Sequence, residues 1–484
     1  MKPFYITTTL PYVNAAPHIG FAMEIIQADV IARFHRLQGN TVIFNFGTDE
    51  HGQKIYEKAI EQGISPQAYC DVYAEKFDAL KDALHLTYTH FIRTTDASHM
   101  KAAQIFWMRC FEKGDIYKKN YQTKYCVGCE LEKTDSELDH GICPIHPNKE
   151  LEIREEENYF FRFSAYQEKL LELYTNYADF VLPAHRLTEI RKFVESGLAD
   201  FSISRLKEKM PWGIEVPNDS AHVMYVWFDA LINYISTLGW PDGEEYLTFW
   251  PGVQMAGKDN LRQQASMWQA MLLSSGVPAS KQIYIHGFIT AEGKKMSKSL
   301  GNVVDPYEIV KEYGTDALRY YLLREIPYGE DGDYSTERME KRYEELANQL
   351  GNLVSRVAAM SESYFNGELE VISKERKELD QRLKESMNRY DFKTYLDAVF
   401  ELVGEANEYI EKKAPFRLVK EDKEAAKGVL SELAEMIRFI AQALLPMMPQ
   451  TAEEILRRYN GVIQKGEPLF PRRDLIPDTL SHTS

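Results

Sequence analysis

The stretch that decides the fold reads FYITTTLPYVNAAPHIGFAMEIIQADVIARFHRLQGNTVIFNFGTDEHG (residues 4–52). Residues 4–10 are apolar and rich in β-branched side chains, which predicts a strand. Residues 18–37 carry apolar side chains near helical spacing, and residues 41–46 predict a second strand. A strand, a helix and a strand with short connections form a βαβ unit, so we expect a parallel sheet of the Rossmann type. Ligands of such sheets bind at the carboxyl ends of the strands.

Outward from this unit, the pattern divides the chain into segments. The α/β pattern of residues 1–115 is interrupted at 116–220 by cysteines, turn residues and short aromatic runs, which indicates an inserted domain. The pattern resumes over 221–334. From 335 to 484 the strand signal disappears and helical runs with charged faces predict an α-helical bundle with a C-terminal tail.

Composition limits the class of protein. The net charge of −16 argues against non-specific coating of nucleic acid, although it leaves room for a local RNA site. No apolar run approaches the roughly 18 residues of a membrane span, and the N-terminus lacks the pattern of a signal peptide. An odd number of cysteines fits a reducing compartment, so we expect a cytoplasmic protein.

A metal site is predicted in the inserted segment, where Cys126-x-x-Cys129 is followed by Cys143-x-x-His146. Two such pairs form knuckles that suit a closed, tetrahedral shell for a structural Zn²⁺ ion. His140 is an alternative fourth ligand. The competing interpretation is a coincidental group of buried cysteines beside a surface histidine.

The first chemical signature is Pro17-His18-Ile19-Gly20-Phe21, at the point where the first strand's loop opens into the helix. Backbone N–H groups and the helix dipole favour phosphate there. His18 can donate to a phosphate oxygen whose charge grows in a transition state, and Gly20 leaves room for a ribose or a flat base. By itself the tetrapeptide is equally compatible with a histidine near a helix cap.

The second signature is Gly293-Lys294-Lys295-Met296-Ser297-Lys298-Ser299-Leu300-Gly301-Asn302. Glycines flank the lysines and serines, which suits a mobile loop. Lys295 and Lys298 could clamp phosphates as pyrophosphate leaves. In isolation, such a loop is more often a solvated turn.

Together these signatures resemble the paired motifs of the class I aminoacyl-tRNA synthetases, and the methionyl family in particular. The resemblance covers nearly the whole chain and includes other stretches: Leu10-Pro11-Tyr12-Val13-Asn14, Gly47-Thr48-Asp49-Glu50-His51-Gly52, Tyr225-Val226-Trp227-Phe228-Asp229-Ala230 and Leu346-Ala347-Asn348-Gln349-Leu350-Gly351-Asn352. It implies a catalytic α/β domain, a zinc-knuckle insertion and a helical anticodon-binding domain. It also implies ATP, Mg²⁺ and Zn²⁺ as cofactors, with methionine and tRNA as partners.

The resemblance also assigns site residues. Asp49 would bind the α-ammonium group of the amino acid, and an apolar pocket would suit a polarizable thioether. The implied methionine pocket consists of Leu10, Tyr12, Trp227, Ala230 and Tyr234. The implied ATP site consists of Asn14, His18, Gly20, Phe21, Glu24, Gly257, Asp259, Ile289 and Lys298. Ordinary core packing is the alternative for any single aromatic residue among them.

The sequence departs from the family at the pocket. Asn260 and Gln264 stand where the family usually has isoleucine and histidine, and Leu231 where some members have proline. These amides could read a polar side chain, which raises the alternative of a divergent paralogue that activates a more polar amino acid for tRNA or a biosynthetic acceptor. Phe21 replaces the second histidine of the His-Ile-Gly-His motif, so an inactive RNA-binding descendant is a further alternative. The third alternative is a nucleotidyltransferase that does not charge tRNA.

For tRNA, the resemblance points to Phe416, which stands for the tryptophan of the family's anticodon platform and could still stack a base. Asn348, Asn352 and Arg356 are spaced i, i+4, i+8, so we expect one helix face to present two amides and a guanidinium. The alternative interpretation is that this helix face is simply polar and exposed to solvent, with no binding role. No C-terminal dimerising module is evident in the sequence, so we expect a monomer.

The expected reaction has two steps. The amino-acid carboxylate attacks the α-phosphate of ATP, which gives an aminoacyl-adenylate and pyrophosphate, and a ribose hydroxyl at the 3′ end of tRNA then attacks the adenylate. His18, Lys295 and Lys298 would stabilise the developing charge. No covalent enzyme nucleophile is needed, so catalysis rests on positioning and electrostatics.

Overall fold

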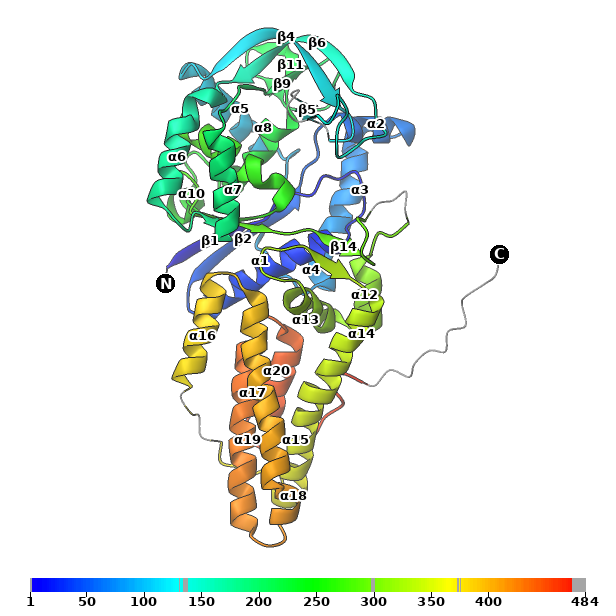
Figure 1. The fold of residues 1–484 in the computed structure, drawn as a ribbon, viewed down its shortest axis with the longest axis vertical. Helices are drawn as coiled ribbons and strands as arrows, with labels where there is room; N and C mark the ends of the chain where they lie inside the picture. Colours follow the sequence, from blue (N-terminus) through cyan, green and yellow to red (C-terminus); the bar gives the residue numbers. More distant parts are fainter. Residues whose placement is uncertain are drawn as a thin grey trace, which may run out of the picture.

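The computed structural model describes residues 2–129, 131–133, 138–296, 301–371, 374 and 376–471. An α/β body carries a long helical stem, and the small inserted sheets lie at the end opposite the stem (Figure 1). No helix of the described part is long and apolar enough to cross a membrane.

The body is built on a six-stranded sheet with the order β3-β2-β1-β12-β13-β7, in which each neighbouring pair is parallel. The expected Rossmann-type sheet is therefore confirmed. The chain runs outward from β1 to β2 and β3 on one side, and β12 and β13 lie on the other. The strands are β1 (Pro3–Thr7), β2 (Thr41–Thr48), β3 (His90–Arg93), β7 (Val181–Leu182), β12 (Val253–Gly257) and β13 (Gln282–His286).

Helices cover both faces of this sheet, which is why its central strands are buried almost throughout. Successive residues of β1 point to opposite faces, so Phe4 and Ile6 join one core while Tyr5 joins the other. The first core contains α1 and α13, and the second contains α5 and α11. The helices of the body are α1 (Ile19–Leu37), α2 (Gln53–Glu61), α3 (Pro66–Asp78), α4 (Leu80–Ala83), α5 (Ala97–Glu112), α8 (Val226–Leu231), α9 (Asn233–Ser236), α10 (Glu244–Phe249), α11 (Trp268–Ser275), α12 (Pro306–Tyr313) and α13 (Thr315–Glu325).

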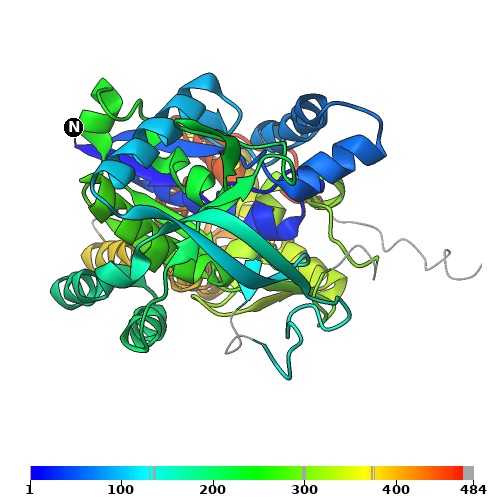
Figure 2. The same ribbon diagram turned by 90° about the horizontal axis from the view of Figure 1, so that it is seen from above.

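The structure divides the predicted insertion, 116–220, between two parts of the molecule. Two small antiparallel sheets, β5-β4-β6-β8 and β10-β11-β9, form the insertion proper, and the long β4–β6 ribbon crosses above the main sheet (Figure 2). Between β6 and β8 the chain returns to the main sheet through β7, which pairs with β13. These elements are β4 (Ile116–Cys126), β5 (Leu131–Lys133), β6 (Glu152–Phe161), α6 (Gln167–Asn176), α7 (Ala184–Glu195), β8 (Phe201–Ser202), β9 (Ser204–Leu206), β10 (Glu215–Val216) and β11 (Asp219–Met224).

The lysine-rich loop follows β14 (Ile289–Ala291), which pairs in parallel with β15 (Gly332–Tyr334). Beyond it lies the expected helical bundle, which forms the stem in Figure 1. A π-turn at Leu346–Gly351 joins its first two helices. The helices are α14 (Thr336–Glu345), α15 (Asn352–Phe365), α16 (Lys377–Asn388), α17 (Phe392–Lys413), α18 (Pro415–Leu418), α19 (Lys423–Leu444) and α20 (Pro449–Arg458).

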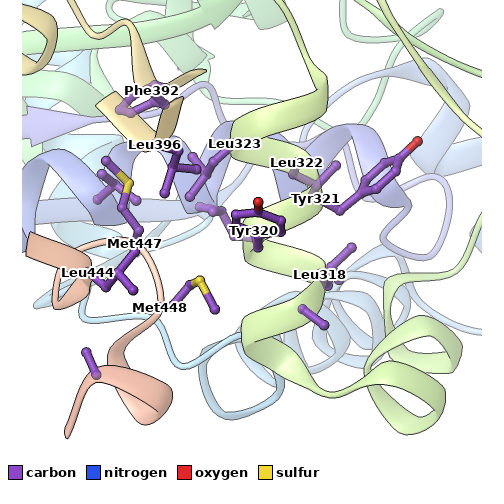
Figure 3. Packing of buried hydrophobic residues seen from close by; sticks show 14 of the residues in the cluster. Leu318, Tyr320, Tyr321, Leu322, Leu323, Phe392, Leu396, Leu444, Met447 and Met448 are labelled. Carbon is purple, nitrogen blue, oxygen red and sulfur yellow. The ribbon is translucent and has the colours of Figure 1, made fainter. Parts of the chain in front are cut away.

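The stem is joined to the body through α13. Figure 3 shows its apolar side chains packed against α17 and the corner between α19 and α20, and these residues belong to the same core as β1 and α1. Within this apolar joint, Arg319 forms an ion pair with Asp29 of α1 at 2.8 Å, and neither side chain is exposed. Arg319 also donates to the carbonyl groups of Pro446 and Met447 at 3.0 and 2.9 Å. The bundle therefore shares its core with the body.

Candidate active site

A cavity of about 290 Å³ opens at the carboxyl ends of β1, β2 and β12. This is where the strand order reverses, and where open α/β sheets bind their ligands. The cavity brings together most of the predicted pocket from segments far apart in the sequence. Its lining includes the predicted residues Leu10, Tyr12, Phe21, Asp49, Trp227, Ala230, Tyr234, Asp259, Asn260 and Gln264.

His18 is the N-cap residue of α1, and its Nδ1 accepts a hydrogen bond from the Gly20 N–H at 3.0 Å. A Cβ atom at position 20 would lie 2.8 Å from His18 Cε1, so the cap requires glycine there. Burial lowers the pKa of His18 to about 4. The imidazole is thus neutral at physiological pH, and because Nδ1 accepts, its proton is on Nε2. His18 can offer one N–H to a ligand.

Phe21 packs on this histidine, with ring centroids 4.3 Å apart, and its edge contacts Phe77 at 5.6 Å. It therefore takes over a packing role and supplies no hydrogen-bond donor in place of the family's second histidine. Ile289 lies beside the His18 cap, because a Cβ atom at Gly20 would contact its side chain. Gly257 is the last residue of β12 and lies next to the His286 ring. Asn14 follows Tyr12 in a tight turn, with its N–H donating to the Tyr12 carbonyl at 2.8 Å.

Glu24 joins the ends of two strands. Its Oε1 accepts from both the N–H and the hydroxyl of Thr9, at 2.7 and 2.6 Å, and its Oε2 accepts from His286 Nε2 at 2.7 Å. Burial disfavours charge on His286, but the bonds to Glu24 and the Gly287 carbonyl outweigh it and raise the pKa of His286. His286 was not among the residues predicted from the sequence, although it is a polar residue at the carboxyl end of a strand of the parallel sheet, where ligands of such sheets bind.

One side of the cavity is formed by loops that follow β1 and β2. Tyr12 and Asp49 pair as a short parallel bridge, and the Val13 N–H donates to the Asp49 carbonyl at 3.2 Å. Opposite them, α8 presents Trp227 and Ala230, both half-buried, to the cavity. A buried pair fixes α8 to the Asp49 loop, because Asp229 Oδ2 lies 3.2 Å from His51 Nδ1. The cavity therefore combines the Asp49 carboxylate with aromatic side chains.

The two amides at which the sequence departs from the family are engaged within the protein. Gln264 is buried, and its side-chain Nε2 donates to the Tyr234 hydroxyl at 2.6 Å. Its side-chain Oε1 accepts from Gln254 Nε2 at 3.3 Å. Asn260 donates to Asp259 at 3.3 Å. Leu231 lines the cavity with an apolar side chain. The pocket therefore keeps an apolar wall despite these departures.

The lysine loop lies only partly within the described residues. Lys295 is exposed, and its carbonyl accepts from the Asn302 side chain at 3.2 Å. A tight turn at Ala291–Lys294 begins the loop, and Asp333 anchors it by accepting from the Gly293 N–H at 2.8 Å. Lys298 lies outside the described residues.

The predicted metal ligands converge. One ligand atom from each of Cys126, Cys129, Cys143 and His146 lies within 4.8 Å of all the others, and Cys129 Sγ lies 3.4 Å from Cys143 Sγ and 3.2 Å from His146 Nδ1. A tetrahedral zinc with bonds of about 2.0–2.3 Å needs ligand separations of roughly 3.3–3.8 Å. Both Cys129 distances lie close to this range, and three thiols with one imidazole are donors that suit Zn²⁺. The alternative ligand His140 is almost fully exposed and lies outside this cluster. Cys129 also lines the cavity.

Comparison with known proteins places this geometry in a family. The family model of class I tRNA synthetases (M) matches residues 4–151 and 135–358, and the anticodon-binding domain of tRNA ligase matches residues 370–475. The methionine–tRNA ligase of Caldanaerobacter subterraneus subsp. tengcongensis is 41% identical, over 98% of this chain and 79% of the relative. The chain belongs to the methionyl-tRNA synthetase family. The methionine–tRNA ligase of Thermosynechococcus vestitus is 42% identical, over 96% of this chain and 92% of the relative.

Solved structures of this family agree. The methionyl-tRNA synthetase of Mycobacterium tuberculosis in complex with methionyl-adenylate matches with a TM-score of 0.92 at 36% identity, covering 98% of this chain and 100% of that one. Its free state matches with a TM-score of 0.84 at 34% identity, covering 98% and 99%. The present structure is thus more similar in overall shape to the adenylate complex than to the free state.

The residues expected to contact tRNA lie along the stem of this methionyl-tRNA synthetase homologue. Asn348 and Asn352 are exposed, whereas Arg356 is half-buried and forms an ion pair with Glu411 of α17 at 2.8 Å. The π-turn at Leu346–Gly351 widens the helix, so Asn348 is rotated relative to the simple i, i+4 pattern. Phe416 lies in α18 at the far end of the stem (Figure 1).

Proposed function

We propose that the residues of this cavity activate methionine with ATP and transfer it to tRNA. The observation that carries the proposal is a neutral N-cap histidine, His18, packed on the cavity residue Phe21 beside a cavity lined by aromatic side chains and by Asp49. The first part suits the phosphates of ATP, and the second suits an amino acid with a long apolar side chain and an α-ammonium group. ATP-dependent ligation of methionine to tRNA is the activity of the family.

In this proposal each group holds or stabilises charge. Asp49 binds the α-ammonium group and so directs the carboxylate toward ATP. His18 donates its Nε2–H to a phosphate oxygen as charge develops, and Lys295, together with Lys298, neutralises the departing pyrophosphate. Asn14, Gly257, Asp259 and Ile289 surround the adenosine, with Glu24 held between Thr9 and His286. Magnesium is expected to enter with the phosphates of ATP.

A screen of ATP–pyrophosphate exchange across all amino acids tests this function. We expect methionine to support the fastest exchange, both in the natural chain and in the Asn260→Ile and Gln264→His variants, because Gln264 is bonded to Tyr234 and Gln254 and Asn260 donates to Asp259. Faster exchange with another amino acid would favour the divergent paralogue, for which the comparisons offer no support. No exchange at all would revive the inactive RNA-binding descendant. Charging of a tRNA with a CAU anticodon would exclude a nucleotidyltransferase.

The cysteine–histidine cluster is proposed to hold a structural zinc ion, because its four donors leave no position open for water. We expect the purified protein to contain about one equivalent of zinc, measured by elemental analysis, because the closed cluster offers a single site. Cys143→Ser should lose that zinc. Cys110→Ser is the matched control, since Cys110 is also buried but lies outside the cluster. Equal zinc in both variants would contradict this assignment.

The stem is proposed to bind the anticodon through Phe416, Asn348, Asn352 and Arg356. Stacking of a base on an aromatic ring contributes about 1–3 kcal/mol, so Phe416→Ala should raise the KM for tRNA by about 5- to 150-fold. Phe416→Trp, which keeps a stacking surface, should not. Pyrophosphate exchange without tRNA should stay unchanged, because α18 lies at the far end of the stem (Figure 1). An unchanged KM in Phe416→Ala would remove this residue from the interface.

We also propose that the protein acts as a monomer in the cytoplasm. Support for the cytoplasm comes from its proposed role in charging tRNA and from its five cysteines, which form no disulfide among the described residues.

A further inference from the structure

Behind the pocket wall lies a chain of buried amides that the proposed chemistry does not use. Gln264 Nε2 donates to the Tyr234 hydroxyl at 2.6 Å, and Gln254 Nε2 donates to Gln264 Oε1 at 3.3 Å. Ser280 Oγ donates to Gln254 Oε1 at 2.5 Å, and Gln269 Nε2 donates to Ser280 Oγ at 3.0 Å. All of these side chains are buried. They link the cavity to α11 and to the segment that leads into β13.

The direction of this chain follows from two backbone groups. The Ser280 N–H donates to Gln269 Oε1 at 3.0 Å, and the Gln264 carbonyl accepts from Gln269 Nε2 at 2.8 Å. A backbone N–H can only donate and a carbonyl can only accept, so the Gln269 amide cannot be reversed. The Ser280 hydroxyl accepts a hydrogen bond from Gln269 Nε2 and donates its own proton to Gln254 Oε1, which turns Gln254 Nε2 toward Gln264. Gln254 then donates to Gln264, and Gln264 donates to Tyr234.

This series of hydrogen bonds therefore ends at Tyr234, whose hydroxyl accepts a hydrogen bond from Gln264. A phenolic hydroxyl has one proton, and that proton is not used within the chain. Tyr234 lines the cavity, so its hydroxyl can direct the proton toward a bound amino acid. Without the chain, Gln264 could turn its carbonyl toward Tyr234 and take that proton for itself.

We propose that Gln254, Gln269 and Ser280 are positioning residues for the choice of amino acid: they hold Gln264 as a donor, so that Tyr234 remains a donor toward the cavity. Given the proposed function, the bound side chain that fits is one with an acceptor and no donor, which is the thioether of methionine. Norleucine has the same shape with a methylene group in place of sulfur, and would leave the Tyr234 proton unpaired. A site built to donate disfavours an analogue that cannot accept.

Gln254→Met tests the chain, because it removes the donor to Gln264 while roughly keeping the side-chain length. The ratio of kcat/KM for methionine to that for norleucine, measured by pyrophosphate exchange, should fall about 5- to 10-fold, the scale of one hydrogen bond. The KM for ATP should stay unchanged. Gln263→Met is the matched control. Gln263 is a buried glutamine that lies next to Gln264 in the π-helical segment Gln263–Met267, and it forms none of these hydrogen bonds. It should keep the ratio of the natural chain.

The pathway through Tyr234 is tested by combination. In a Tyr234→Phe background the ratio should already be low, and adding Gln254→Met should change it no further. An unchanged ratio in Gln254→Met alone, an equal loss for both amino acids, or a further fall in the double variant would each overturn the inference.

Calorimetric binding of methionine and norleucine without ATP separates this inference from the proposed function. If the protein binds methionine in preference to norleucine, and loses that preference in Gln254→Met, the chain acts as proposed even where exchange fails. If exchange with methionine succeeds but the binding preference is the same in both proteins, the function stands and the inference falls.

Discussion

His18→Ala should lower the rate of methionine-dependent pyrophosphate exchange by about 10²–10³-fold, the loss that follows removal of one transition-state donor. The physical reason is the fixed imidazole. Nδ1 is occupied by the Gly20 N–H at 3.0 Å, so Nε2 presents its proton to the phosphates. Phe21 supplies no donor that could compensate, because it packs against the His18 ring. The effect should appear in kcat more than in the KM for methionine, since His18 is expected to act on ATP.

The same residue should give no pH dependence near neutrality. Burial lowers the pKa of His18 to about 4, so the neutral donor form predominates at any pH well above that value and is lost only in acid. The rate of the natural chain should therefore not fall between pH 8 and pH 6 because of His18. A control variant is His35→Ala, which removes a second histidine of α1 whose pKa is also lowered to about 4 but which lies at the other end of the helix. A loss of rate equal to that in His18→Ala would assign the effect to the helix and not to the donor.

Arg319→Met should cause the largest loss of stability, about 3–5 kcal/mol, because it leaves a buried charge without its partner. Asp29 would keep Arg33 at 2.8 Å but lose Arg319, and the Leu84, Pro446 and Met447 carbonyls would lose a donor in the apolar joint of Figure 3. The midpoint of urea unfolding should shift to lower urea. Arg382→Met is the control, since Arg382 pairs with Glu401 at the surface, where both side chains are about half exposed. Such a pair contributes at most about 1 kcal/mol.

The loss should also depend on pH. Burial would raise the pKa of Asp29, but Arg319, Arg33 and a hydrogen bond from Thr87 outweigh it and hold the pKa below its usual value. A lowered carboxyl pKa stabilises the folded state above the usual value of about 4, and that stabilisation is lost as the pH falls through the lowered pKa. The difference between the natural chain and Arg319→Met should therefore be full at pH 7 and shrink in acid. A difference independent of pH would show that the ion pair is not its source.

The elements that carry the candidate site could be predicted because they depend on local signals. A strand, a turn and a helix carry Leu10, His18 and Glu24 in order along the chain, and knuckle spacing marks the four residues proposed as metal ligands, whereas the roles of Leu10 and Glu24 came from the family resemblance. His286 and Thr9 could not be found in the same way. They act through a carboxylate on another element, and a strand residue gives no sign of which distant side chain it will meet.

The inserted segment shows a second limit. Its cysteines and aromatic runs mark a break in the α/β pattern, but β7 spans only Val181–Leu182 and its pairing with β13 is long-range. A strand this short has no periodicity to read. The placement of this segment in the main sheet is therefore visible only in the structure.

The sequence by itself determined the parallel α/β body, the helical stem and the paired signatures, because hydrophobic period, glycine positions and ligand spacing are written locally along the chain. Only the tertiary structure decided what Asn260 and Gln264 do. An amide side chain can bind a substrate or bond to the protein, and the residue type is the same in both cases. The sequence therefore does not reveal the partner of the amide. Gln264 is bonded to Tyr234 and Gln254 by contacts that cross 30 and 10 residues of chain, so its amide is engaged within the protein. The same dependence on long-range contact holds for Arg319, whose partners come from α1 and from the far corner of the bundle.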